Sequence, residues 1–320
     1  MGQTVPVRRP SWTPGSQRTV LLAGLVLPLV AVAALYLRPS GEVLQTVDLP
    51  QVAAAPAAAA LPFAEPDGTT ERFSSAGRAR AALVQDPLAG QRARGVVIVL
   101  SPHSLTAART ATDVRFDELR SRGYAIAYPS TLDGDWNAGR CCGTSQRTGV
   151  DDVRFLQDLR GRLLEQYGLT GRQVGLVGYS TGGQMAYRTV CEHPTFARAV
   201  VIVAGSLETP CHPDHALPPT LVVHGLEDST IPWAVTVRRT QLLDYSPTPA
   251  LSSVGAYARA AGCGRRVLDR SDGRWLMGWP DCDRIPLLSA VGMPGTGHGW
   301  TPLGGSVYAT RFLPQHLESP

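Results

Sequence analysis

The chain has 320 residues and a net charge of +4 at pH 7, and all 30 of its basic side chains are arginines. The arginines are scattered along the chain and form no stripe interleaved with aromatic residues, so a nucleic-acid-binding protein is excluded.

The N-terminal part of the chain predicts attachment to a membrane. Residues 1–19 are basic, and residues 20–37 form an uncharged apolar run that Arg38 closes. The run has about the length of roughly 17–25 residues that a transmembrane helix requires, and such a helix tolerates Pro28. The preceding positive charge predicts a cytoplasmic N-terminus and an extracytoplasmic remainder. A cleaved signal peptide, processed near residues 31–33, is the alternative and would give a secreted protein.

The Ala- and Pro-rich segment 38–64 is typical of a spacer. Residues 65–320 follow as one domain, which is long enough for a substantial core. Only a short tail follows the last motif described below, so we expect no appended polymer-binding module.

Strands and helices alternate along this domain. A helix is predicted to begin near Thr148, which with Asp151 resembles a capping arrangement. The apolar positions of this helix recur at helical spacing and are expected in the core: Val150, Val153, Leu156, Leu159 and Leu163. Apolar runs predict buried strands at 95–99, 123–128, 174–177, 198–203, 219–223 and 285–291. This alternation favours an α/β fold with a doubly wound, mostly parallel sheet.

The motif G-Y-S-T-G at 178–182 lies between the predicted strand 174–177 and a predicted helix. A G-x-S-x-G turn in this context holds its serine in a strained, exposed position above the sheet, and its small residues let strand and helix approach closely. Ser180 is therefore the candidate nucleophile. The alternative is a glycine-rich turn with an incidental serine.

A serine hydroxyl needs a base to take its proton and a carboxylate to orient that base. Asp228 follows the predicted strand 219–223, and His298 follows the predicted strand 285–291. Loops at the carboxyl edge of a parallel sheet would bring Asp228, His298 and Ser180 together. Glu227 is the alternative acid, although a short side chain fixed at a strand end suits an orienting role better.

Other histidines are interpreted as structural. His224 precedes the acid in the chain, so we expect it to bond within its own turn, and we expect a similar role for His193 and His316. The segment C-H-P-D-H at 211–215 has a spacing that metals sometimes use, but no second ligand cluster accompanies it. We therefore expect a disulfide-bonded cysteine in that loop and no metal.

These motifs together resemble a family of esterases. The similar segments are D-W-N-A-G-R-C-C-G at 135–143, V-D-D-V at 150–153, and the three turns that hold Ser180, Asp228 and His298. The chain is similar over residues 70–315 to polyhydroxybutyrate depolymerases and to feruloyl or acetylxylan esterases. The resemblance implies an α/β-hydrolase fold, no cofactor, and these three residues as the catalytic triad.

One loop departs from this family. Where the family has L-H-G after its first long strand, the chain has L-S-P-H-S at 100–104. The tetrahedral intermediate of an ester needs two donors, usually the amide after the nucleophile and one from this loop. The first is expected from Thr181. Because Pro102 has no N–H, the second is expected from His103 or Ser104.

Six cysteines in an exported domain predict disulfides. Cys263 and Cys282 are expected to pair, because both lie in the insertion between acid and base. Neighbouring Cys141 and Cys142 are expected to bond to separate partners, since a ring closed between neighbours strains the peptide. Two bonds are thus expected among Cys141, Cys142, Cys191 and Cys211.

The sequence therefore predicts an anchored or secreted serine esterase for short-chain acyl or hydroxyacyl esters, soluble oligomers included. The residues expected to line its cleft are Trp136, Asn137, Tyr179 and Trp300. The insertion after Asp228 forms either a cleft wall or a disulfide-stapled surface hairpin, through Arg265, Arg266, Arg270, Arg274, Trp275 and Trp279. Two alternatives stay open: a cell-envelope acyltransferase with the same triad, and an inactive binding protein of this fold.

Overall fold

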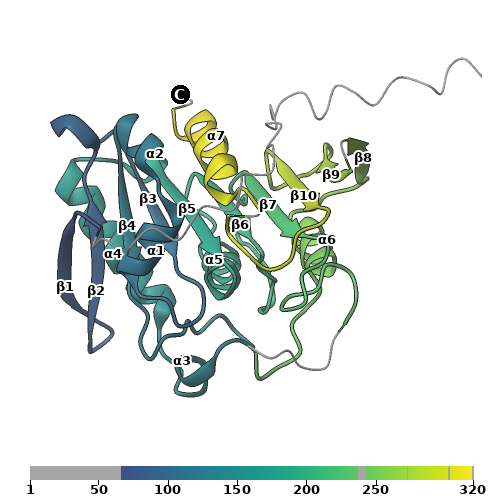
Figure 1. Ribbon diagram of the computed structural model, residues 1–320, viewed down its shortest axis with the longest axis horizontal. Coiled ribbons are helices and arrows are strands. Elements are labelled where there is room, and N and C mark those ends of the chain that lie inside the picture. Colours follow the sequence, from purple (N-terminus) through teal and green to yellow (C-terminus); the bar gives the residue numbers. More distant parts are fainter. Residues whose placement is uncertain (1–65, 237–242, 272, 302, 319–320) are drawn as a thin grey trace, which may run out of the picture. The chain divides into compact units, whose positions relative to one another are not determined.

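The computed structural model describes residues 66–236, 243–271, 273–301 and 303–318 (Figure 1). All of them belong to Gly41–Pro320, the second of two units into which the chain divides. The predicted anchor at 20–37 and spacer at 38–64 lie outside the described residues. Within the described ranges, no helix combines the length and the apolar character that a membrane span requires.

Ten strands form one sheet, in the order β1-β2-β4-β3-β5-β6-β7-β10-β9-β8. The strands are β1 (Thr69–Ser75), β2 (Arg78–Gln85), β3 (Gly95–Leu100), β4 (Tyr124–Pro129), β5 (Val174–Tyr179), β6 (Ala199–Val203), β7 (Thr220–Gly225), β8 (Val267–Ser271), β9 (Arg274–Trp279) and β10 (Leu288–Met293). The middle of the sheet, from β4 to β10, is parallel. Antiparallel hairpins β1–β2 and β8–β9 complete its two edges (Figure 1).

Helices cover both faces of this sheet. They are α1 (Ala107–Val114), α2 (Asp117–Ser121), α3 (Gly143–Arg147), α4 (Asp152–Tyr167), α5 (Thr181–Glu192), α6 (Ala250–Ala260) and α7 (Gly305–Leu317), with short 3₁₀ turns at Leu88–Gly90 and Gly171–Gln173. Helices α4, α5 and α6 contribute to the core on one face, whereas α1, α2 and α7 contribute to the core on the other.

Strand β3 shows how the sequence produces two cores. Val96, Ile98 and Leu100 belong to one core, and Val97 and Val99 belong to the other. Successive side chains of a strand point to opposite faces, so an uninterrupted apolar strand is stable only when both faces are covered. The doubly wound, mostly parallel α/β sheet is therefore confirmed.

The predicted strands are all present, and two local details differ. The last parallel strand, β10, begins at Leu288, later than the predicted residue 285. The predicted cap of α4 is wrong: Asp151 is the N-cap, and its Oδ1 accepts a hydrogen bond from Arg154 N at 3.0 Å. Thr148 instead ends α3, and Val150 is buried just before α4 begins. A carboxylate at the N-cap satisfies a helix amide that the threonine is too far upstream to reach.

The insertion between acid and base contains a hairpin, β8–β9, that extends the sheet. Strand β9 pairs with β10, β8 pairs with β9, and the disulfide Cys263–Cys282 closes the base of the hairpin. Trp275 lies opposite Gly292 in register, and the Arg270 guanidinium lies 4.3 Å from the Trp275 ring centroid. These contacts support the surface hairpin, one of the two interpretations that the sequence left open.

Candidate active site

Three parallel strands carry the candidate residues at their carboxyl ends. Ser180 directly follows β5, Asp228 lies in the turn after β7, and His298 lies in the turn after β10. Strands β5, β6, β7 and β10 are successive neighbours in the sheet. The turns therefore meet at one edge, as expected for a parallel sheet.

Ser180 lies in the sharp turn between β5 and α5. Its φ of 55° and ψ of −119° are values that a non-glycine residue rarely adopts. A Cβ built on Gly178 would lie 2.7 Å from the carbonyl carbon of Gly182, and one built on Gly182 would lie 2.6 Å from the carbonyl oxygen of Ser101. Both glycines of the motif are thus required, because strand, helix and the loop after β3 approach closely here.

A continuous hydrogen-bonded chain links the three candidates. His298 Nε2 lies 2.8 Å from Ser180 Oγ, and His298 Nδ1 lies 2.7 Å from Asp228 Oδ2. Asp228 Oδ1 accepts hydrogen bonds from the amides of Thr230 at 2.8 Å and Ile231 at 2.9 Å. With both carboxylate oxygens engaged, the imidazole has a fixed orientation toward the serine.

Asp228 is kept ionised by its donors. Its carboxylate is fully buried, and burial alone would raise its pKa, but hydrogen bonds from His224 and His298 hold the pKa well below its ordinary value. Glu227, the alternative acid, accepts a hydrogen bond from Gly295 N at 3.0 Å. The structure thus brings Asp228 to the imidazole, while Glu227 braces the neighbouring turn.

Two backbone amides are candidates for an oxyanion hole, the pair of donors that an acyl intermediate needs. Thr181 is the first residue of α5, where backbone N–H groups have no acceptor within the helix. In the loop after β3, the amide of Ser104 donates to Gly134 O at 2.9 Å. Of the two residues that the sequence left open, His103 therefore has the amide that bonds to no other described residue.

Solved structures match this architecture. The structure of a protein called sOPH has a TM-score of 0.55 at 16% identity, with 82% of this chain and 90% of that chain covered. An acetyl xylan esterase from Aspergillus awamori has a TM-score of 0.58 at 15% identity, with coverage of 77% and 99%. A prolyl endopeptidase has a TM-score of 0.53 at 14% identity, with coverage of 79% and 39%. The chain has the α/β-hydrolase fold.

At these identities the likeness shows the fold and no substrate. No protein-family profile matches the sequence. No curated protein sequence matches it either.

His224 has a place that the sequence did not predict. It is fully buried, and its Nε2 lies 2.7 Å from Ile231 O and 3.2 Å from Asp228 Oδ2. Both neighbours are acceptors, so Nε2 carries the proton. The bond within its turn was expected, but the contact with the candidate acid was not. The i, i+4 spacing of His224 and Asp228 across one strand-end turn was the available signal.

The aromatic ring of Tyr179 packs against the imidazole of His298. Tyr179 stacks on it with ring centroids 5.6 Å apart and an interplanar angle of 28°, and Trp300 meets Tyr179 edge-on at 5.9 Å. Burial and the charge of Asp228 raise the pKa of Tyr179 to about 12. Of these two predicted cleft residues, the half-buried Tyr179 contacts His298, whereas Trp300 contacts Tyr179 and is only 5% exposed.

The other two predicted cleft residues lie deeper in the α/β-hydrolase fold. Trp136 is fully buried, and its indole N–H donates to Ser101 O at 2.9 Å. The Asn137 side-chain amide donates to Val150 O, and its backbone N donates to Asp152 Oδ2. These contacts assign Trp136 and Asn137 to the support of neighbouring loops, because their polar groups already bond to protein.

Three disulfides join the cysteines of the described residues: Cys141–Cys142, Cys191–Cys211 and Cys263–Cys282. The Cys263–Cys282 bond was predicted. The expectation that Cys141 and Cys142 bond to separate partners is wrong. The fold brings Cys191, at the end of α5, next to Cys211 in the loop after β6, so Cys141 and Cys142 have only each other.

His193, His316 and the loop that holds Cys211 lie outside the three turns of Ser180, Asp228 and His298. The His193 amide donates to Thr189 O at the end of α5, and the His316 ring packs on Phe312 within α7. Cys211 is disulfide-bonded. Across the described ranges, no group of His, Cys, Asp and Glu side chains could hold a metal ion.

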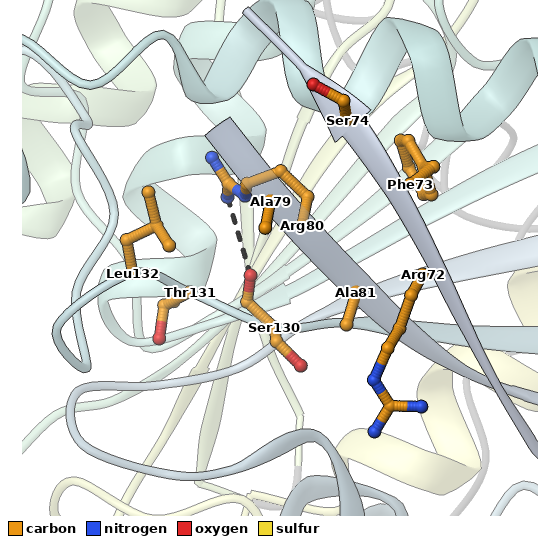
Figure 2. A pocket seen from close by; sticks show the side chains of 9 residues that line it. All are labelled: Arg72, Phe73, Ser74, Ala79, Arg80, Ala81, Ser130, Thr131 and Leu132. Carbon is orange, nitrogen blue, oxygen red and sulfur yellow. Dashed lines mark hydrogen bonds between the residues drawn. The ribbon is translucent and has the colours of Figure 1, made fainter. Parts of the chain in front are cut away.

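A cavity of about 580 Å³ lies beside the β1–β2 hairpin, apart from the triad turns. Figure 2 shows its two arginines pointing in opposite directions, with Arg80 directed at the carbonyl of Ser130. The lining residues are Arg72, Phe73, Ser74, Ala79, Arg80, Ala81, Ser130, Thr131 and Leu132. None of them belongs to the turns of Ser180, Asp228 or His298.

Proposed function

We propose that the protein is a serine esterase in which Ser180 is the nucleophile, His298 the base and Asp228 the acid. The observation that carries this proposal is the hydrogen-bonded chain from Ser180 Oγ through His298 to the buried Asp228. A serine on a strained strand-to-helix turn, bonded to an imidazole that a carboxylate orients, is activated for acyl transfer.

In the proposed mechanism, His298 Nε2 accepts the proton of Ser180 as Oγ attacks the ester carbonyl carbon. The amides of Thr181 and His103 stabilise the negative oxygen that forms. The imidazolium, stabilised by Asp228, then gives its proton to the leaving alcohol and an acyl-enzyme results. Water repeats the sequence, with its proton passing to His298, and releases the carboxylic acid.

We propose short-chain acyl or hydroxyacyl esters as substrates, soluble oligomers included. The resemblance of the motifs to esterases of that kind supports this choice. The half-buried Tyr179 stacks on His298, and the buried Trp300 packs edge-on against Tyr179, so the space next to the base is restricted.

The proposal is tested with a fluorophosphonate probe and a series of nitrophenyl esters of increasing acyl length. Ser180→Ala is expected to abolish labelling and to lower kcat/KM by at least about a thousandfold. The matched control is Ser252→Ala, which removes an exposed hydroxyl from α6 and is expected to change neither. Stoichiometric labelling of Ser180→Ala would place the nucleophile elsewhere, and a wild-type protein that neither labels nor hydrolyses any ester would refute the proposal.

We also propose an extracytoplasmic location for the catalytic domain. Disulfides persist mainly in oxidising compartments, and all cysteines of the chain are paired in the structure. Attachment through residues 20–37, or secretion after cleavage, is the accompanying proposal. Cell fractionation with immunodetection of the N- and C-terminal ends would distinguish an anchored from a cleaved chain.

A further inference from the structure

The loop between β3 and α1, residues 101–106, supplies the second oxyanion amide in the proposed mechanism. This segment, called the oxyanion loop below, lies against the nucleophile turn, because a Cβ on Gly182 would be only 2.6 Å from Ser101 O. Pro102 has no N–H and the Ser104 amide is engaged with Gly134 O. The conformation of the loop at His103 therefore decides whether the oxyanion hole has its second amide donor.

Three consecutive residues after β4 hold the oxyanion loop. Gly134 O accepts the amide of Ser104 at 2.9 Å, and Trp136 Nε1 donates to Ser101 O at 2.9 Å. Between them in the sequence, Asp135 Oδ1 lies 2.6 Å from His103 Nδ1. The two backbone attachments flank His103, and the side-chain attachment acts on His103 itself.

The Asp135 carboxylate is built into its position. Its side chain is 7% exposed, and the carbonyl of Asp135 lies within 2.9 Å of Ser145 Oγ. A Cβ on Gly143 would lie 2.9 Å from the carboxyl carbon of Asp135, so only glycine leaves room for this carboxylate. The first and last residues of the D-W-N-A-G-R-C-C-G segment thus fit each other.

The His103 ring has one fixed edge and one open edge. Its Nδ1 carries a proton, because the neighbouring Asp135 oxygen is an acceptor. Its side chain is 40% exposed, and Nε2 bonds to no other described residue. The imidazole thus acts as a tether between Asp135 and the backbone of the oxyanion loop.

We propose that Asp135 is a positioning residue for the oxyanion hole, which it holds through the His103 imidazole. This inference rests on the proposed function. A glycine in this loop, as the esterase family has, reaches its conformation without a side chain. In this chain the S-P-H sequence replaces it, and the Asp135–His103 pair fixes the amide instead.

The test measures kcat and KM separately for 4-nitrophenyl acetate in the full-length protein. Asp135→Ala is expected to lower kcat about 10- to 100-fold with KM changed less than about threefold, since an oxyanion donor acts mainly in the transition state. Asp135→Asn is expected to keep most of kcat, because an amide oxygen still accepts from Nδ1. Asp133→Asn is the control, since it removes an exposed carboxylate of the same turn.

A double-mutant cycle separates the tether from general loss of structure. His103→Ala keeps the backbone amide and loses the ring, so it is expected to match Asp135→Ala, and the double variant is expected to be no worse than either. Additive losses, or a kcat of Asp135→Ala equal to that of wild type, would overturn the inference. A kcat loss that simply follows a lowered melting temperature would do the same.

Failure of the proposed function has a different signature. A wild-type protein that hydrolyses no ester contradicts that function, and the tether is then tested by ¹⁵N NMR of histidine-labelled protein. The Nδ1–H tautomer of His103 is expected in the wild type and is expected to be lost in Asp135→Ala. An unchanged His103 spectrum would overturn the tether independently of activity.

Discussion

The buried ion pair between Arg80 and Asp152 gives a prediction about stability that is independent of function. The guanidinium lies 2.7 Å from Asp152 Oδ1, with side-chain exposures of 1% and 0%. It also lies 3.6 Å from the Phe155 ring centroid, while Asp152 Oδ2 accepts the amide of Asn137. The pair thus joins β2 to α4 and to the loop after β4.

Replacing Arg80 with Met leaves a buried carboxylate without its cation. Removing one partner of a buried pair costs about 3–5 kcal/mol, of a total stability on the order of 5–15 kcal/mol. For a domain of this size, each kcal/mol lowers the melting temperature by about 2–4 °C, so Arg80→Met is expected to lose about 6–20 °C. The methionine still packs on Phe155, which limits the additional loss of contact.

The assay is thermal and urea unfolding with the disulfides intact. The matched control is Arg78→Met, which removes an exposed arginine of the same strand and is expected to change stability by less than about 0.5 kcal/mol. Arg80→Met combined with Asp152→Asn is expected to recover at least half of the loss. The amide oxygen still accepts from Asn137, and no charge is left buried.

Lowering the pH is expected to reduce the stability difference between Arg80→Met and the wild type. Burial raises the pKa of Asp152 above its ordinary value of 3.8 even though Arg80 opposes this, and loss of Arg80 raises it further. Between 3.8 and the folded pKa, the folded state binds more protons than the unfolded state, so stability falls as pH rises through that window. The stability of Arg80→Met should therefore be closer to that of wild type at pH 5 than at pH 8. The difference is up to about 1.4 kcal/mol for each unit by which the loss of Arg80 raises the pKa of Asp152. A deficit under about 1 kcal/mol at pH 8, or one independent of pH, would refute the reasoning.

Three further predictions concern the candidate triad. Asp228→Asn is expected to lower kcat less than His298→Ala does, because the acid orients the base but transfers no proton. Steady-state kinetics on one nitrophenyl ester compares the two variants. A fully active Asp228→Asn would remove Asp228 from the mechanism. His224→Phe deprives Asp228 of a donor and leaves Ile231 O unpaired, so it should cost about 1.5–3 kcal/mol of stability in urea unfolding. His224→Gln still donates a hydrogen bond and should cost less. Equal losses of stability in the two variants would argue against the hydrogen bond. Tyr179→Leu removes the aromatic ring that stacks on His298 and stabilises its protonated form, so kcat should fall severalfold. Tyr179→Phe keeps the ring and should leave kcat unchanged. Identical kcat values for the two variants would count against the stacking.

The parallel centre of the fold was predictable because its strands are apolar along their whole length. Residues 95–100 of β3 are buried at every position, so the apolar run alone predicts a strand without knowledge of the neighbouring strands. Strand β1 is different: five of its residues alternate between exposed and half-buried, and it is a strand only because β2 pairs with it. Edge strands depend on partners that a local pattern does not show.

The candidate site divides in the same way. The sequence predicted which three side chains the structure brings within hydrogen-bond distance, because each follows a parallel strand and the fold places strand ends together. The contacts of Asp135 with His103 and of Cys191 with Cys211 were missed, since each involves a loop residue whose position is not fixed by the end of a neighbouring parallel strand. Only the path of the loops decides such pairs.

The order of the strands has a consequence for how the protein opens. Strand β5, which carries Ser180, is the fifth of ten, with β3 and β6 bonded to its two sides. Amides in such a central strand exchange their hydrogens with solvent only when the whole domain unfolds, whereas edge hairpins open locally and often. The turn that holds Ser180 therefore follows the strand whose amide hydrogens are expected to exchange last. Local opening of the β1–β2 or β8–β9 hairpin is expected to leave that turn folded.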